Sequence, residues 1–405
     1  MNIKKMNISY SITLTIFPAL NGDSLLISYG VNKKKHILVD CGYVTTYKSY
    51  IKKELVEIAN NGECLEKLII THIDSDHIWG AIPFLKDNQE GFIEIKEVWH
   101  NTFRHLVIGA EKEENNSNNE KKIVKRILSR GYFNNEPKNG EKQISAEQGT
   151  TLGALLLKGD YSWNNDFNNK AVCIENKKTV NIDLESQIIL LSPNKEKIDN
   201  LKTFWDNELT KYDLKYSKEA GSLYDDAFEM LLTWIKESQA KGIQAISSNK
   251  IQMEELLASI PVEDKTPTNG SSIAFILKIK EKKLLFLADS HPGLILKSLL
   301  EYQPEDVINF DCIKVSHHGS FNNVSLELLE KIDSEVYIFS TNGNRHNHPD
   351  KETIAHIVGK KSGFERKLFF NYKTLNSEYF NNQDWMKTYN YSIHYLHQDN
   401  YKINL

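Results

Sequence analysis

One short segment of the sequence, THIDSDHIWG at 71–80, places four possible metal ligands within six residues. His72, Asp74, Asp76 and His77 directly follow an apolar run that is typical of a buried strand. Residues i and i+2 of a strand point the same way, and the following loop can fold the next two back beside them. The spacing therefore predicts two pairs of ligands, His72 with Asp74 and Asp76 with His77, for two metal ions about 3.5–4 Å apart.

A structural interpretation of the same segment is that its carboxylates cap a helix. Asp76 precedes His77, where a helix is predicted to begin, and Asp is a favoured N-cap residue. That role explains one carboxylate but does not explain the second Asp or the two His residues. Oxygen-rich sites with few imidazoles suit Mn²⁺ or Mg²⁺, although Zn²⁺ also binds most of them tightly. We therefore expect two divalent metal ions, Mn or Zn, with manganese the first choice.

The elements that position this segment are predicted from alternating and helical hydrophobic patterns. The predicted strands are 12–17, 24–30, 36–42, 67–72 and 92–100, and a helix is predicted at 50–59. The first three strands form a meander whose turns contain Pro, Asn and Gly. This order of elements predicts β-sheets that are covered by helices.

The middle of the chain has a different pattern, and we interpret about 104–265 as a mainly helical insertion within a single domain, 1–405. Short strands are predicted there at 154–158, 171–175 and 187–191, and a helical block at 198–258. The aromatic residues of that block recur at helical spacing, which is typical of a packed face. The insertion is therefore expected to pack over the site as a cap.

Further candidate ligands lie at strand ends in the last third of the chain. Strands are predicted at 272–279, 283–289, 311–320, 336–341, 367–371 and 391–397, and helices at 326–332 and 350–359. Asp289 ends one strand, His317 and His318 lie near the end of another, and His348 follows a third in a polar loop. Adjacent residues of a strand point to opposite faces, so one of His317 and His318 can ligate a metal while the other contacts substrate or packs.

The composition is that of an ordinary globular protein, with 405 residues, 40% hydrophobic and 26% charged. The net charge of −4 provides no overall attraction to nucleic acid or to an anionic membrane, so a polyanionic partner must be held locally. Four cysteines without C-x-x-C spacing indicate reduced thiols and a cytoplasmic location. No apolar run reaches 18 residues, so we expect no membrane span.

The order of these motifs resembles the metallo-β-lactamase fold superfamily, in particular the branch that includes the hydrolase domain of the competence protein ComEC, whose second motif is H-x-D-x-D-H. The resemblance is carried by Asp40-Cys41-Gly42, His72 to His77, Asp289, His317-His318-Gly319-Ser320 and His348-Pro349, which span about 40–350. It implies an α/β fold, an αββα four-layer sandwich of the metallo-β-lactamase type, with the helical insertion added to it.

The resemblance also implies a role for each of these residues. The implied metal ligands are His72, Asp74, Asp76, His77, Asp289 and His317. Asp289 would bridge the two metals, and Asp40 would support the metal-binding loop from behind. Asp76 is counted with His348 and His318 as catalytic, the two histidines as candidates to protonate the leaving oxygen.

One segment departs from the superfamily pattern. Most members have a further metal histidine just before the strand that leads to the bridging Asp, whereas here 268–272 reads Thr-Asn-Gly-Ser-Ser. The site of His72 and Asp74 is then one protein ligand short, and substrate or water would complete it.

The activity that these expectations favour is that of a metal-dependent hydrolase, most simply a phosphodiesterase or nuclease. Two adjacent metals lower the pKa of a bridging water from about 15.7 toward about 7 and so provide a hydroxide. The substrate would be a phosphodiester, in nucleic acid or in a small nucleotide. Alternatives are hydrolysis of a lactone, thioester or β-lactam-like bond, since the fold does not fix the function, or a non-catalytic protein that binds a partner through 104–265. The sequence identifies no protein partner.

Overall fold

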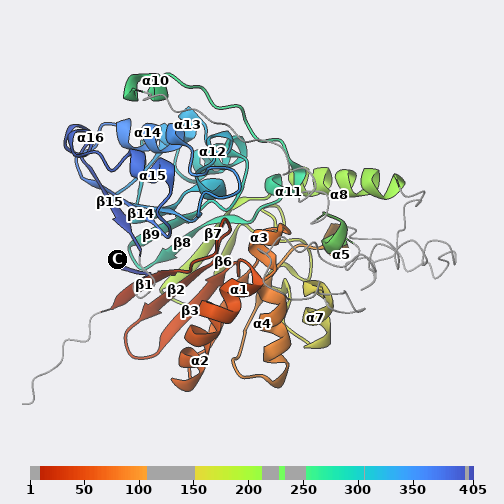
Figure 1. Cartoon of the computed structure of the whole chain (residues 1–405). Coiled ribbons are helices and arrows are strands. Elements are labelled where there is room, and N and C mark those ends of the chain that lie inside the picture. The colour runs from red at the N-terminus through yellow and green to blue at the C-terminus, as the bar shows by residue number, and fades with distance from the viewer. Residues whose placement is uncertain (1–9, 107–150, 212–227, 233–251, 305, 397–400) are drawn as a thin grey trace, which may run out of the picture.

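Two β-sheets lie face to face, and helices cover the outer face of each (Figure 1). The structure is a computed structural model that describes residues 10–106, 151–211, 228–232, 252–304, 306–396 and 401–405. The first sheet, in sequence order, contains β1 (Ser11–Ile16), β2 (Leu25–Gly30), β3 (Lys34–Val39), β4 (Leu65–Ile69), β5 (Val98–Trp99) and β16 (Lys402–Asn404). Its spatial order is β16-β1-β2-β3-β4-β5, with β3, β4 and β5 parallel.

The second sheet is larger and has the spatial order β15-β14-β13-β11-β9-β8-β7-β6. In sequence order its strands are β6 (Thr179–Asn181), β7 (Ser186–Ser192), β8 (Ala274–Ile279), β9 (Lys282–Phe286), β11 (Cys312–Lys314), β13 (Val336–Phe339), β14 (Arg366–Phe370) and β15 (Tyr391–Tyr395). A short parallel pair joins β10 (Ile308–Phe310) to β12 (Ile332–Ser334). The strands from β9 to β15 are parallel, and β6 to β8 are antiparallel to their neighbours.

Helices form the two outer layers. Those of the first half are α1 (Val44–Thr46), η1 (Tyr47–Ile51), α2 (Lys52–Asn60), α3 (Ser75–Ile78), α4 (Ala81–Asp87), η2 (Asn88–Glu90), α5 (Phe103–Leu106), α7 (Leu152–Lys158), η3 (Asn165–Phe167) and α8 (Lys195–Thr210). Those of the second half are α10 (Met253–Leu257), α11 (Pro267–Gly270), α12 (Pro292–Tyr302), η4 (Ser316–Gly319), η5 (Phe321–Asn323), α13 (Leu326–Lys331), α14 (Lys351–Gly359), α15 (Leu375–Tyr379) and α16 (Gln383–Tyr389). Within the described ranges, no helix has both the length and the apolar character needed to cross a bilayer.

Three separate hydrophobic cores show that the arrangement has four layers. Ile37 and Val39 of β3 belong to the core between the sheets, whereas Leu38 faces the helices of the first layer. In the second sheet, Leu284 faces inward and Leu285 packs against the outer helices. Successive side chains of a strand point to opposite faces, so both faces of these strands must be apolar. The predicted αββα sandwich is therefore confirmed.

The predicted helical insertion at about 104–265 is not confirmed. The described part of that range contains β6 and β7, and β7 pairs with β8 inside the second sheet. The strand predicted at 154–158 is wrong, because these residues form helix α7. The strand predicted at 171–175 is also wrong, whereas 187–191 lies within β7. Of the helical block predicted at 198–258, the described parts in α8, 228–232 and α10 are helical, and 212–227 and 233–251 lie outside the described residues.

Candidate metal centre

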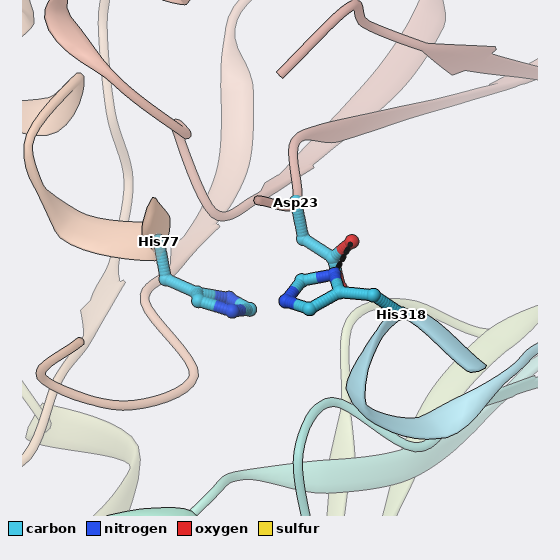
Figure 2. Close-up of side chains that lie close together, drawn as sticks. All are labelled: Asp23, His77 and His318. Atoms are coloured by element: carbon cyan, nitrogen blue, oxygen red, sulfur yellow. Dashed lines mark hydrogen bonds and ion pairs between the residues drawn. The ribbon is translucent and has the colours of Figure 1, made fainter. Parts of the chain in front are cut away.

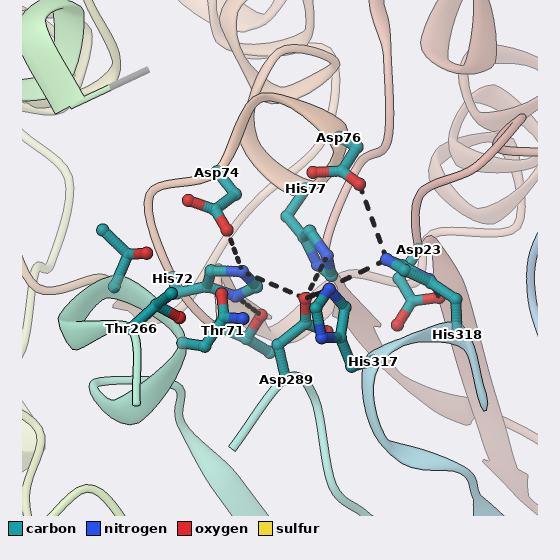
Figure 3. A network of polar contacts seen from close by, with 12 residues as sticks. Asp23, Thr71, His72, Asp74, Asp76, His77, Thr266, Asp289, His317 and His318 are labelled. Carbon is teal, nitrogen blue, oxygen red and sulfur yellow. Dashed lines mark hydrogen bonds and ion pairs between the residues drawn. The ribbon is translucent and has the colours of Figure 1, made fainter. Parts of the chain in front are cut away.

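The site lies where strands of both sheets end at their carboxyl termini. Loops after β3, β4, β9 and β11 supply Asp40, the segment 72–77, Asp289 and the pair 317–318. In α/β folds, ligand sites form at this edge because the loops that follow parallel strands converge there. Side chains of the segment 72–77, Asp289 and the pair 317–318, which are far apart in the sequence, point toward one another (Figure 3).

The backbone at these strand ends adopts left-handed conformations. Asp40, Ala288, His317 and His318 have φ angles of 55°, 46°, 43° and 57°. Such conformations are costly for residues other than glycine and persist only where the surroundings enforce them, most often at functional sites. The His317 N–H donates to the Ala288 carbonyl at 2.8 Å, which ties the β11 loop to the loop that presents the Asp289 carboxylate.

Asp289 is the centre of the cluster. Its Oδ2 lies 3.6 Å from Nε2 of His72, 3.7 Å from Nε2 of His77 and 3.5 Å from Nε2 of His317. Nε2 of His318 lies 4.0 Å from the same oxygen. Asp289 is buried, so four imidazole nitrogens surround one carboxylate oxygen that is removed from bulk water.

Hydrogen bonds on the far side of three rings fix which nitrogen carries the proton. Nδ1 of His77 donates to Asp40 at 2.8 Å, and Nδ1 of His318 donates to the Ser340 carbonyl at 3.0 Å. Nδ1 of His317 lies 2.6 Å from the amide oxygen of Asn323. Because these partners only accept, each Nδ1 must carry the hydrogen in the neutral ring. Each Nε2 then directs a lone pair toward Asp289.

His72 and Asp74 form the other side of the cluster. The hydroxyl of Thr71 lies 3.0 Å from Nδ1 of His72 and donates to Asp40 at 2.7 Å, so Asp40 supports both histidines of the motif. Nε2 of His72 lies 3.0 Å from Oδ2 of Asp74. Helix α3 begins after Asp74, and the Asp74 side chain makes no capping hydrogen bond to it. The capping interpretation therefore does not account for this carboxylate.

Asp76 faces the second side of the cluster, toward His318. Its Oδ2 lies 3.5 Å from Nε2 of His318 and accepts a hydrogen bond from Nδ2 of Asn21 at 3.1 Å. Asn21 is in turn fixed by the Tyr43 hydroxyl, which donates to its Oδ1 at 3.1 Å. Our sequence interpretation assigned Asn21 only to a turn, because Asn-Gly-Asp is a strong turn signal and nothing in it indicates a distant partner.

Several polar atoms of the cluster have no hydrogen-bond partner. Among the described residues these include Nε2 of His77, Nε2 of His318 and Oδ1 of Asp289, all buried. Buried polar atoms are nearly always paired, so exceptions require an explanation such as a bound ion. Imidazole lone pairs that face a carboxylate repel it unless a cation lies between them. The donor set thus fits one or more divalent cations, and two groups here have the geometry to hold a metal, His72–His77–Asp289 and Asp23–His77–His318.

The same proximity shifts the pKa values of the cluster. Burial raises the pKa of Asp289, but the neighbouring histidines, His317 foremost, hold that pKa well below its usual range. Burial lowers the pKa of His318, but the Asp23 and Asp289 carboxylates raise it to about 9. The protein part of this site therefore favours additional positive charge, whether protons or metal ions.

A cavity of about 510 Å³ opens beside the cluster. Asp76, His317, His318 and His348 line one end of it, and Phe204 and Leu232 are apolar members of its wall. His348 is half-buried, its Nδ1 lies 3.1 Å from Asp350, and its ring centre lies 5.7 Å from that of His317. The structure thus brings His348 to the same cavity as Asp76, His317 and His318.

The expectation that His317 and His318 point to opposite faces of a strand is wrong. Strand β11 ends at Lys314, and both histidines lie in the turn η4 with left-handed backbone angles. Their Nε2 atoms both lie within 4.0 Å of Asp289 Oδ2. A turn of this kind rotates successive side chains to one side, so alternation along a strand no longer applies.

The segment 268–272, where the superfamily pattern leads one to expect a histidine, lies mainly in the short helix α11. Asn269 donates to Asp264 at 2.5 Å, and Asp264 also accepts from Asn323 at 3.0 Å. Asn323 is the residue whose amide oxygen orients His317. This segment therefore supports the site through hydrogen bonds, and the carboxylate nearest to His72 remains Asp74.

The comparison with protein families agrees with this geometry. Residues 18–150 match the family model described as "Metallo-beta-lactamase superfamily", a superfamily that is generally hydrolytic and metal-dependent. No curated protein matches the sequence significantly. Among solved structures, a protein of unknown function from Enterococcus faecalis V583 is similar at 10% identity, covering 96% of this chain and 78% of that one, with a TM-score of 0.24.

A TM-score of this size supports no conclusion about fold or function, so the family match and the geometry stand without it. The matched range includes the H-x-D-x-D-H motif but ends before Asp289, His318 and His348. It does not distinguish a ComEC-like branch from others. The comparisons thus show similarity to the metallo-beta-lactamase superfamily over residues 18–150.

Proposed function

We propose that this chain is a metal-dependent phosphodiesterase of the ComEC-like branch of the superfamily. One observation carries the proposal, namely that four imidazole Nε2 atoms lie within 4.0 Å of one oxygen of the buried Asp289, with the Asp76 carboxylate 3.5 Å from one of them. Such a cluster is costly to keep for stability alone, because its buried polar atoms without a hydrogen-bond partner carry a desolvation penalty. Divalent cations would offset that cost and supply hydrolytic chemistry.

The cluster divides into two sets of ligands that share Asp289. His72 and Asp74 would hold one cation, as their 3.0 Å separation suggests. Asp76, His77 and His318 would hold the other. The three carboxylates give the site the oxygen-rich character that suits manganese ahead of zinc.

We assign the ligand role to His318 and the substrate-facing role to His317, the reverse of the preference drawn from the sequence. The His318 side chain is 4% exposed, and its Nε2 is unpaired and directed at Asp76 and Asp289. The His317 side chain is 19% exposed in the cavity wall. A ligand gains from burial and fixed orientation, whereas a residue that contacts substrate must be reachable.

The remaining residues would act on the substrate. When bound, two divalent cations would supply Lewis acidity and an activated water. His348, held by Asp350 at the cavity wall, would donate a proton to the leaving oxygen. His317, oriented by Asn323, would hydrogen-bond a non-bridging oxygen of the phosphodiester.

The cavity favours a small substrate over a nucleic acid within this proposal. Among the described residues that line it, Arg345 is the only Lys or Arg. Binding a polynucleotide requires several cationic contacts to successive phosphates. A small cyclic or linear dinucleotide carries few charges and matches a wall that combines Arg345 with apolar Phe204 and Leu232.

The proposal is tested by a panel of substrates with the chain stripped of metal and then reloaded with Mn²⁺. We expect cleavage of bis-p-nitrophenyl phosphate and of a dinucleotide that chelator abolishes and Mn²⁺ restores, with little dependence on salt. Asp87→Asn is a matched control, because Asp87 is a carboxylate distant from the cluster that pairs with Lys52. Turnover of nitrocefin, a lactone or an acyl thioester without phosphodiester cleavage would contradict the proposal, as would partner binding without any metal.

A further inference from the structure

Asp23 lies beside the ring of His318 and contacts it on the Nδ1 side (Figure 2). Its Oδ1 is 3.2 Å from Nδ1 of His318, the nitrogen that also donates to the Ser340 carbonyl. Both partners accept only, so Nδ1 must carry the hydrogen and Nε2 must present its lone pair to Asp76 and Asp289. This relation repeats that of Asp40 to His77 on the neighbouring ring.

A buried lysine holds this carboxylate. Nζ of Lys314 lies 2.5 Å from Oδ2 of Asp23, and both side chains are no more than 3% exposed. Lys314 also donates to the Val315 carbonyl at 3.1 Å. Both Asp23 oxygens are therefore already engaged, one by Lys314 and one by His318. Although Asp23 lies close enough to His77 and His318 to be a candidate ligand, its contacts are those of a residue that orients a ligand.

The loop that carries Asp23 packs closely against the motif at 72–77. A Cβ at Gly22 would lie 1.9 Å from the Asp76 carbonyl oxygen, so only glycine fits there. The Asp23 N–H donates to that same carbonyl at 3.2 Å, and the Ser340 hydroxyl donates to the Gly22 carbonyl at 2.7 Å. These contacts set the position of Asp23 relative to both Asp76 and His318.

We propose that Asp23, with Lys314 as its buried counter-charge, is a positioning residue that fixes the orientation of His318 and strengthens metal binding at Asp76, His77 and His318. The inference rests on the metal-binding part of the proposed function. Carboxylates that hydrogen-bond a ligating histidine typically contribute 10–100-fold to metal affinity. Asp23 would therefore affect affinity without touching metal or substrate.

The test compares Mn²⁺ affinity, measured by calorimetry on the full chain, with the midpoint of thermal unfolding. Asp23→Asn is expected to bind the metal about 10–100-fold more weakly than wild type. It also leaves Lys314 without its counter-charge, so its unfolding midpoint should fall. The double variant Asp23→Asn/Lys314→Met carries no unpaired buried charge. We expect it to regain much of the lost thermal stability while its Mn²⁺ affinity stays low.

Asp166→Asn is the control, because it weakens a partly buried ion pair with Lys67 at a site apart from the cluster. It should lower thermal stability and leave Mn²⁺ affinity unchanged. Wild-type affinity in folded Asp23→Asn, or affinity restored together with stability in the double variant, would overturn the proposal. If Asp23→Asn fails to fold, the double variant alone decides. A wild-type chain that binds no metal would instead contradict the proposed function.

Discussion

The second sheet carries a cluster of buried charges near each of its two ends, and the two differ in how their charges are satisfied. At the carboxyl ends of β9 and β11, Asp289 lies among histidines and retains an unpaired oxygen. Near the amino ends of β13 and β14, Asp333 accepts from Arg366 at 2.9 and 2.6 Å and from the Tyr337 hydroxyl at 2.9 Å. Lys360 completes this second cluster, 3.4 Å from Asp333.

The two clusters differ in whether their buried polar atoms have partners: those around Asp333 do, and several around Asp289 do not. Every charged group around Asp333 faces an opposite charge or a hydrogen-bond partner, and none of its atoms is among the unpaired buried atoms of the described chain. A satisfied network can be kept for stability or specificity, whereas an unsatisfied one implies a missing partner. We therefore expect the two clusters to respond to mutation in opposite ways.

The largest expected effect is the loss of activity in Asp289→Asn. The variant removes the carboxylate that both ligand sets share, so metal-dependent hydrolysis should fall by about 10⁴-fold or more. The thermal midpoint of the metal-free chain should fall only modestly: the histidines that hold the pKa of Asp289 low also stabilise its charge, but the Asn amide can donate to their neutral Nε2 atoms. Turnover numbers and calorimetric melting measure the two effects. A variant that keeps its activity, or that melts much earlier, would make Asp289 a structural residue.

The opposite pattern is expected for Arg366→Met. Arg366 is fully buried, and its removal leaves Asp333 without its main partner. Breaking a buried pair from one side costs about 3–5 kcal/mol of unfolding free energy, measured by urea denaturation. Metal affinity and turnover of the folded variant should match wild type. A selective loss of metal binding would show that the two ends of the sheet are not independent.

A pair of variants sharpens the comparison within the metal cluster. His318→Ala should weaken Mn²⁺ binding by more than about 100-fold, a larger loss than in Asp23→Asn, because it removes the proposed ligand and not only the carboxylate that orients it. His317→Ala should keep the metal content and raise KM, because its ring faces the cavity. Metal analysis and steady-state kinetics on both variants give the answer. The reverse outcome would restore the sequence-based preference for His317 as the ligand.

The smallest expected effect is a pH dependence in the structural cluster. Burial lowers the pKa of Lys360 from 10.5 to about 8, although Asp333 opposes this. Between these two pH values the unfolded chain binds more protons than the folded chain, so Lys360 makes stability rise with pH in that window. Urea denaturation at pH 8 and pH 10 should show a rise in wild type that is smaller in Lys360→Met. Equal pH slopes in the two proteins would contradict this.

Most of the strands could be predicted because their patterns are strong. The predictions at 12–17, 272–279 and 336–341 overlap β1, β8 and β13, whose buried residues follow the expected alternation or run. Helix α7 was predicted as a strand because its short apolar run, LGALLLK, does not distinguish a buried helix from a buried strand. Strand β5 covers only 98–99 of the predicted 92–100, because pairing with β4 is brief.

The site was predictable where its ligands are close in sequence and less so where they converge by folding. The spacing of His and Asp within the motif at 72–77 is visible in the sequence. The structure places all of its predicted side chains in one cluster with Asp289. Asp23 could not be found, because its partner His318 is 295 residues away and a Gly-Asp turn is common on any surface. The left-handed backbone conformation at His317 could not be predicted either, because residues other than glycine normally avoid that conformation.

The most direct test of the central claim is a count of bound metal. Metal-free chain would be dialysed against Mn²⁺, and separately against Zn²⁺, and the ions per chain measured by mass spectrometry for wild type, Asp76→Ala and the surface control Asp87→Asn. The proposed function predicts two ions in wild type and in the control, and fewer in Asp76→Ala. No bound metal in wild type, or the same count in Asp76→Ala, would contradict the claim that this cluster is a two-metal hydrolytic site.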